Sequence, residues 1–389
     1  MKKKYDLDAA AEAYRLVRID CLRFEEARAL FNRNHKPALN ANQFTGLVFR
    51  HEKLLADKET SKAVVCQDRA KHEMTRTAAL RRVLSSTANE EPEILVGMEK
   101  LVKKIQRIKV KPKAKSAGKR SMTIEVLISD LHIGLKTKKF NYSEAIKRMT
   151  IVVNEVKGEI EREGLTYSID KLLIPILGDI INSSTMHGYS SAIESEFTNS
   201  EQVVKAVELL YAYLISPLAV LGIPIVIPCI TGNHDRSETA KLLVNPGYHN
   251  LSWIAYRLLE ILCNASGFTN VSFQITEQAF HHTKIYNNVV FYEHGDTLGS
   301  LNRVSMDKLI QRRQTQIGSL IDFYRIGHYH EYTVFGQGRI VVNGSLCGET
   351  GFANTLGLFS CAGQTINLYV ETKNRPTCFF KSYPVYLGE

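Results

Sequence analysis

From residue 123 onward, short apolar runs alternate along the chain with longer amphipathic segments. Three of these runs, each rich in β-branched residues, are TIEVLIS (123–129), KLLIPIL (171–177) and IPIVIPC (223–229). Residues 142–163 and 200–221, which lie between the runs, carry apolar residues at helical spacing. This order of strands and helices predicts a mostly parallel sheet flanked by helices, so we expect an α/β domain over residues 123–389.

The pattern before residue 123 is helical instead. Two segments place apolar residues on one helical face: Ala27, Leu30 and Phe31 in residues 25–34, and Phe44, Val48 and Leu55 in residues 41–55. A short break that contains Pro37 separates the two segments, as is usual where a helix ends. We therefore expect an all-α domain over residues 1–107, which a Lys-rich linker over residues 108–122 joins to the α/β domain.

Two helices joined by a short turn resemble a helix-turn-helix DNA-binding motif. Arg50 and Lys53 lie on the second predicted helix and are candidate contacts to a nucleic acid. A helical hairpin that docks another protein, or a second copy of the chain, has the same pattern. The sequence leaves both interpretations of the N-terminal domain open.

The net charge of +10 belongs to the N-terminal third of the chain. Residues 1–121 hold 28 Lys and Arg against 15 Asp and Glu, whereas residues 122–389 hold 22 against 25. In the linker, Lys occurs at nearly every second position. Clustered Lys and Arg bind nucleic acids by releasing counterions from the phosphates. The linker is therefore either a solvated flexible tether or a tether that also binds phosphates, and DNA is the expected partner.

Composition and cysteine usage exclude several classes of protein. The chain is 44% hydrophobic and 23% charged, which is typical of a globular protein. We expect no signal peptide, since no apolar stretch follows the basic tip, and no membrane span, since no run of about 18 apolar residues occurs. The seven cysteines form no CxxC pair, and such a scattered, odd set favours a reducing compartment over a disulfide scaffold.

Polar side chains follow each of the predicted strands. Seven of them are candidate metal ligands: Asp130, His132, Asp179, Asn233, His294, His328 and His330. Ligands of open α/β sheets collect outside the carboxyl ends of the strands, and an i, i+2 spacing on extended backbone places two side chains on one face. The set offers imidazole, carboxylate and amide oxygen but no thiolate, which suits Mn, Fe, Zn or Ni.

Five short blocks contain these residues, in the order SDLHIG, LGDIIN, TGNHD, YEHGD and GHYH. In content and order, from residue 129 to residue 330, they resemble the blocks of the calcineurin-like metallophosphoesterases. The resemblance implies a four-layer α/β sandwich with two divalent metal ions at one end, Mn being the first expectation and Fe, Zn or Ni the alternatives. The loop GSLCG (344–348) lies near the site in related folds, so we expect it to shape the site.

The resemblance also implies a role for each residue. The implied ligands are Asp130, His132 and His330 for one ion, Asn233, His294 and His328 for the other, and Asp179 for both. His234 is the implied catalytic histidine, which faces the substrate phosphate without binding a metal, and Asp235 orients it. Two such ions lower the pKa of a shared water and neutralise phosphate oxygens, while a histidine protonates the leaving oxygen. The expected reaction is hydrolysis of a phosphate ester.

The substrate is less constrained by these blocks. They are similar to those of SbcD-type DNA repair nucleases, including phage-encoded ones, but those enzymes carry a His three residues after the bridging Asp, where this chain has Asn182. His187 on the same loop is a candidate substitute, so Asn182 and His187 are both candidate substrate contacts. The GDxxDRG signature of phosphoprotein phosphatases is not matched by GDIINSS.

We therefore expect a metal-dependent DNA nuclease, acting as an exonuclease or an endonuclease. One alternative is a phosphatase or phosphodiesterase of small nucleotides or phosphoproteins. The other is a DNA-binding scaffold with a structural metal site, against which the complete ligand set with His234 argues. We expect a cytoplasmic location, in the host if the chain is phage-encoded, and no membrane association. A homo-oligomer is compatible with the sequence, and nothing in it resembles a docking segment for an SbcC-like ATPase, so that partner is not inferred.

Overall fold

The computed structural model divides the chain into two compact units, Met1–Ala78 and Ala79–Glu389. It describes residues 7–19, 22–34, 38–49, 51, 90–103, 105, 107–186, 189–236, 250–348, 361–372 and 378–388. The candidate contacts Arg50, Lys53 and His187 lie outside these described residues.

The described part of the first unit is helical, as predicted. It contains α1 (Leu7–Tyr14), the π-helical turn η1 (Arg15–Ile19), α2 (Phe24–Asn34) and the helical residues 41–49. Ala27 and Phe31 of the first predicted face, and Phe44 and Val48 of the second, are buried in one core. Leu30 is 39% exposed, because Ala27 and Phe31 are one helical turn apart and Leu30 lies at the flank of the stripe they form.

The second unit contains two sheets. The larger has the strand order β11-β10-β1-β2-β3-β4, and the smaller has the order β5-β6-β7-β9-β8. The strands are β1 (Ser121–Leu127), β2 (Ser168–Leu173), β3 (Ile225–Cys229), β4 (Val271–Ile275), β5 (Phe280–Ile285), β6 (Asn288–Glu293), β7 (Phe323–Ile326), β8 (Thr333–Phe335), β9 (Ile340–Val342), β10 (Gly363–Val370) and β11 (Phe379–Tyr386). As predicted, β1, β2, β3 and β4 pair in parallel, while β10 joins β1 antiparallel.

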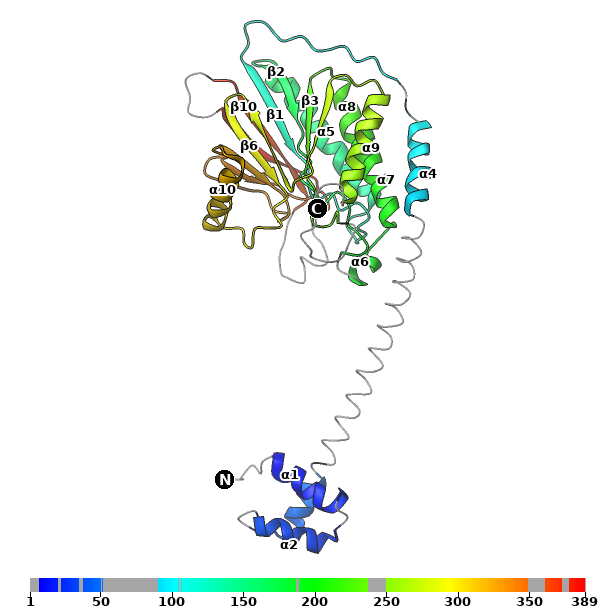
Figure 1. Cartoon of the computed structure of the whole chain (residues 1–389), viewed down its shortest axis with the longest axis vertical. Coiled ribbons are helices and arrows are strands. Elements are labelled where there is room, and N and C mark those ends of the chain that lie inside the picture. Colours follow the sequence, from blue (N-terminus) through cyan, green and yellow to red (C-terminus); the bar gives the residue numbers. More distant parts are fainter. Residues whose placement is uncertain are drawn as a thin grey trace. The chain divides into compact units, whose positions relative to one another are not determined.

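Helices cover the outer face of each sheet. They are α4 (Glu90–Lys103), α5 (Tyr142–Gly164), α6 (Tyr189–Ile193), α7 (Asn199–Leu209), the π-helical segment η2 (Leu210–Ile215), α8 (Ser216–Ala219), α9 (Leu251–Ala265) and α10 (Arg303–Ile317). Figure 1 shows α5, α7, α8 and α9 beside the larger sheet and α10 beside the smaller one. Met306 and Ile310 of α10 share a core with Phe291 and Tyr324 of the smaller sheet. The order helix, sheet, sheet, helix is the expected four-layer α/β sandwich.

One helical stretch of this unit, Asn199–Ala219, is long and apolar enough to cross a membrane by length and composition alone. It is an exception to the expectation of no such span. However, 56% of its most apolar window is buried inside the unit, where Val203, Leu210 and Leu218 belong to the core. A helix packed among other elements on most sides is apolar on most sides, which accounts for this composition.

The segment predicted to be a flexible linker is docked on the second unit. The backbone N–H groups of Ile108 and Lys113 donate to the carbonyl oxygens of Ser266 (3.0 Å) and Gly222 (2.9 Å). Gly222 and Ser266 precede β3 and β4, so the segment runs along the amino ends of these strands (Figure 1). The helix α4 also belongs to this unit, although it falls within the predicted domain 1–107, because its buried Met98 lies in the same core as α7.

A buried ion pair lies between the two sheets. Nε of Arg325 on β7 donates to Oε2 of Glu125 on β1 at 3.0 Å, and both side chains are 0% exposed. Asn367 and Tyr369 on β10 donate to the same carboxylate at 2.8 and 2.7 Å. Tyr292 on β6 also donates to this carboxylate, so the cluster ties β1 and β10 of the larger sheet to β6 and β7 of the smaller.

Arg325→Leu is expected to lower the free energy of unfolding by about 3–5 kcal/mol, because it leaves the Glu125 carboxylate buried without its ionic partner. Urea unfolding followed by circular dichroism measures the change. Arg303→Leu is the matched control, since Arg303 pairs with Asp307 on the exposed side of α10, and losing such a pair costs about 1 kcal/mol or less. Equal effects of the two substitutions would contradict the role given to the buried pair.

Candidate metal centre

The candidate ligands gather where strands of both sheets end. The loops after β1, β2, β3, β6 and β7 carry, in that order, Asp130 and His132, Asp179, Asn233, His294, and His328 and His330. The carboxyl ends of these five strands lie at one end of the sandwich. The structure thereby brings together all seven ligands predicted from the sequence, as the following distances show.

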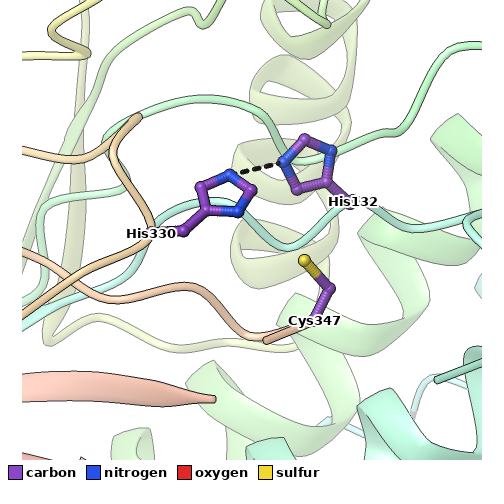
Figure 2. Close-up of side chains that lie close together, drawn as sticks. All are labelled: His132, His330 and Cys347. Atoms are coloured by element: carbon purple, nitrogen blue, oxygen red, sulfur yellow. Dashed lines mark hydrogen bonds between the residues drawn. The ribbon is translucent and has the colours of Figure 1, made fainter. Parts of the chain in front are cut away.

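Part of this set surrounds one position. Nε2 of His132 and Nε2 of His330 lie 3.2 Å apart (Figure 2). Nε2 of His330 also lies 3.3 Å from Oδ1 of Asp130, and Nε2 of His132 lies 3.9 Å from Oδ2 of Asp179. These donor atoms come from different loops; His132 belongs with His330 to one group of potential ligand atoms within 4.8 Å of one another, and with Asp179 to another, whereas Asp130 contacts His330.

The remaining ligands surround a second position beside the first. Nε2 of His294 lies 3.1 Å from Oδ2 of Asp179, 2.9 Å from Oδ1 of Asn233 and 3.2 Å from Nδ1 of His328. Asp179 thus belongs to both groups, and its carboxylate faces both positions.

The donor set fits divalent metal ions. Two ligand atoms bound at about 2.1 Å in a tetrahedral site lie roughly 3.4 Å apart, which is close to most of the spacings above. Nδ1 of His294 donates to the carbonyl oxygen of Leu177 at 2.8 Å, and this bond turns Nε2 toward the cluster. An outer hydrogen bond of this kind is the usual companion of a metal-binding histidine.

Backbone strain is concentrated in the ligands. Five of them have a positive φ: Asp130 (52°), His132 (44°), Asp179 (50°), His328 (70°) and His330 (58°). This conformation costs a non-glycine residue roughly 1–2 kcal/mol, so other contacts must hold it. The N–H of His132 donates to the carbonyl oxygen of Asp179 at 3.0 Å, and the N–H of His328 donates to Oδ2 of Asp130 at 3.0 Å. Strain of this kind clusters at functional sites.

Two glycines allow the loops to approach the ligands closely. A Cβ at Gly232 would lie 2.1 Å from Oδ1 of Asp179, and a Cβ at Gly327 would lie 2.6 Å from Oδ2 of Asp130. Both distances are shorter than a non-bonded carbon can tolerate, so a larger residue would displace a ligand. The site therefore explains the glycines of the TGNHD and GHYH blocks.

The cluster attracts positive charge. Burial works to raise the pKa of Asp130, but the hydrogen bond and charge of His330 outweigh it and lower that pKa to about 2. Burial likewise works to lower the pKa of His294, but the charge and hydrogen bond of Asp179 raise it to about 10. The Asp130 carboxylate is thus ionised at neutral pH, and a metal ion that coordinates His294 displaces its proton.

Asp235 supports the backbone around the ligands. Its carboxylate is fully buried and accepts the N–H groups of Gly232 (2.7 Å), Asp179 (3.0 Å) and Ile180 (3.0 Å). Burial and the charge of Asp179 raise the pKa of Asp235 to about 6. This side chain therefore joins the loop after β2 to the loop after β3, and it positions its neighbour His234 through the backbone.

His234 lies at the edge of the cluster, and one of its ring nitrogens belongs to a group of potential ligand atoms with His132 and Asp179. Its backbone N–H donates to Oδ1 of Asp179 at 2.8 Å, and its ring centroid lies 4.6 Å from that of His132. Nδ1 of His234 donates to the backbone carbonyl oxygen of Asn182 at 2.8 Å. Asn182, predicted as a substrate contact, thus orients the His234 ring through its main chain.

The sequence analysis did not assign Cys347. Its sulfur belongs to a group with His132 and His330 in which one potential ligand atom from each residue lies within 4.8 Å of the others. The only signal was its place in the GSLCG loop, which the sequence analysis expected to shape the site.

Solved structures resemble the chain weakly. A predicted phosphoesterase from Streptococcus pneumoniae TIGR4 is 12% identical over 68% of this chain and 98% of its own length, with a TM-score of 0.28. Vacuolar Protein Sorting 29 from Cryptosporidium parvum is 12% identical, with a TM-score of 0.30; the match covers 68% of this chain and 97% of that protein. Vps29 from Entamoeba histolytica, complexed with Zn²⁺, is 12% identical, with a TM-score of 0.28; the match covers 68% of this chain and 99% of that protein. No family model and no curated protein matches the sequence. At such TM-scores the similarities carry no argument about function, which rests on the site itself.

Proposed function

We propose that the chain is a two-metal phosphodiesterase of the calcineurin-like type that hydrolyses DNA. One observation carries the proposal: the Asp179 carboxylate lies between two groups of ligands, 3.9 Å from Nε2 of His132 and 3.1 Å from Nε2 of His294. Both distances are to Oδ2, so this one anionic oxygen faces both groups and can bridge two cations. A site of this kind suits attack of water on a phosphate ester.

The chain's own residues supply the rest of the chemistry. When bound, two divalent ions would lower the pKa of a water between them and neutralise the phosphate oxygens. Asp130, His132 and His330 would hold one ion, Asn233, His294 and His328 the other, and Asp179 both. His234 is fixed through Nδ1 by the Asn182 carbonyl, so Nε2 is the nitrogen that delivers a proton to the leaving oxygen.

A row of lysines supports DNA as the substrate. Lys109, Lys111, Lys113 and Lys115, called here the lysine ridge, are exposed, and they alternate with Val110, Pro112 and Ala114. Val110 packs against the core, and the segment is held by backbone hydrogen bonds. The ridge therefore presents four exposed positive charges to a polyanion.

The position of the ridge favours a long substrate. It lies along the amino ends of β3 and β4, whereas the metal ligands follow the carboxyl ends of β1, β2 and β3. A strand of seven residues such as β1 spans about 23 Å. A molecule that contacts both the ridge and the metal centre must be at least about this long, which a DNA chain is and a mononucleotide is not.

A substrate panel tests the proposed function. With Mn²⁺ present, the full chain should hydrolyse single-stranded or duplex DNA, and it should also cleave a small nitrophenyl phosphodiester more slowly. Cleavage of the small diester without cleavage of either DNA would favour the alternative of a small-nucleotide or phosphoprotein enzyme. Absence of all hydrolysis in metal-loaded protein would favour a scaffold with a structural metal site.

Replacing the four lysines of the ridge by glutamine is expected to weaken DNA binding and to reduce the slope of log K against log salt by about 3–4 for duplex DNA. Hydrolysis of the small diester should not change, since the ridge is remote from the ligands. Binding measured across a salt series provides the slope. The control replaces Lys100, Lys103, Lys284 and Lys308, which are also exposed, by glutamine. Equal slopes for the two variants would contradict a specific role of the ridge.

A further inference from the structure

Cys347 lies at the metal centre, on the loop that follows β9. Its side chain is 2% exposed, and its sulfur is grouped with nitrogens of His132 and His330 within 4.8 Å of one another. Figure 2 shows the sulfur directed toward the two imidazole rings. Cys229 and Cys263 are buried as well, but neither belongs to any of the ligand groups found among the described residues.

The loop that carries Cys347 is fixed relative to the ligands. Nη1 of the buried Arg148 donates to the carbonyl oxygens of Leu346 and Cys347, each at 2.9 Å. The N–H of Leu346 donates to the carbonyl oxygen of Asp130 at 3.0 Å, and the N–H of Gly348 donates to Oγ of Ser345 at 3.0 Å. The loop is thereby bonded to the backbone of the ligand Asp130 and to α5, so the Cys347 sulfur has a defined place beside the ligands.

We propose that Cys347 is a sulfur ligand of the ion that Asp130, His132 and His330 hold. The inference rests on the metal centre of the proposed function but not on its substrate. Zinc binds imidazole nitrogen at about 2.1 Å and thiolate sulfur at about 2.3 Å, so its N and S ligands lie roughly 3.6 Å apart. Small movements of the side chains bring a group within 4.8 Å to that spacing. When the metal–sulfur bond forms, the thiol proton leaves to solvent.

Sulfur ligation makes the two positions chemically different. The position beside Asp130, His132 and His330 then offers carboxylate, imidazole and thiolate. The position beside His294 and His328 offers carboxylate, imidazole and the amide oxygen of Asn233. A thiolate selects softer ions such as Zn²⁺ and Cd²⁺ over Mn²⁺ and Mg²⁺. Soft ions are therefore expected to bind more tightly at the Cys347 position than at the Asn233 position.

Titration of the full chain with Cd²⁺, without substrate, tests the proposal. The wild type should develop a sulfur-to-cadmium charge-transfer absorption in the ultraviolet, and Cys347→Ser should lose it. Cys347→Ser should also weaken Cd²⁺ binding by roughly 10- to 100-fold while leaving Mn²⁺ binding within about threefold. Cys361→Ser is the matched control, because Cys361 is exposed and belongs to none of the ligand groups found among the described residues. An absorption that Cys347→Ser leaves unchanged would overturn the proposal.

X-ray absorption of the Zn²⁺-loaded wild type gives a test that needs no variant. A sulfur neighbour of zinc at about 2.3 Å is expected, and a shell of nitrogen and oxygen alone would overturn the proposal. These readouts do not depend on hydrolysis. Sulfur ligation without any phosphodiesterase activity would reject the proposed function alone, and hydrolysis with a sulfur-free metal shell would reject the cysteine ligand alone.

Discussion

Asp179→Ala should reduce hydrolysis of a small phosphodiester by on the order of 10³-fold or more, because it removes the carboxylate that faces both metal positions. The bound metal should also fall below two ions per chain. Steady-state kinetics and elemental analysis of the same preparation measure both effects. Asp307→Ala is the matched control, since Asp307 makes only an exposed ion pair with Arg303 on α10. An Asp179→Ala protein that keeps two ions and full turnover would contradict the bridging role.

His234→Ala should lower kcat by roughly 10²- to 10⁴-fold while leaving the metal content unchanged. In the proposed function, His234 delivers a proton to the leaving oxygen, and the metal ligands are other residues. His281→Ala serves as the control, since His281 lies on β5 and contacts Gln274 at 3.0 Å. If His234→Ala lost its metal together with its activity, His234 would be a ligand and its assigned role would be wrong.

The convergence of the candidate ligands at one end of the sandwich could be predicted because it depends on strand order. Once TIEVLIS, KLLIPIL and IPIVIPC are recognised as parallel strands, Asp130, Asp179 and Asn233 must lie at one end of a sheet. His294 and His330 come from the second sheet, and their place opposite the first set followed from the resemblance of the ordered blocks. The four-layer architecture followed from the same resemblance, and the core residues of α10 and the smaller sheet confirm it.

The docked segment could not be predicted from its composition. Residues 108–115 read Ile-Lys-Val-Lys-Pro-Lys-Ala-Lys, a strict alternation that is typical of an extended chain with one face packed. The high charge favoured a solvated tether instead. A distant residue decides between a docked segment and a solvated tether. The carbonyl oxygen of Gly222, more than 100 residues away in the sequence, accepts the N–H of Lys113. A contact with so distant a residue cannot be predicted from the sequence of residues 108–115 alone.

The geometry of the site could not be predicted from the sequence either. Asp130 and His132 have φ values of 52° and 44°, a left-handed conformation that Asp and His adopt more often than most non-glycine residues but that surrounding hydrogen bonds must still maintain. The sequence predicts that Asp235 orients His234, but its carboxylate binds three backbone N–H groups from two loops. Cys347 went unassigned because no second cysteine marks a metal motif near it, and only the fold brings it to His330.

The number and place of the metal ions test the central claim most directly. Crystals of the full chain grown with saturating Mn²⁺, with anomalous diffraction recorded at the manganese edge, should show two ions about 3.5–4 Å apart with the Asp179 carboxylate between them. Elemental analysis of the same protein should give two ions per chain. A single ion or none at saturation, or two ions that do not share Asp179, would contradict the account.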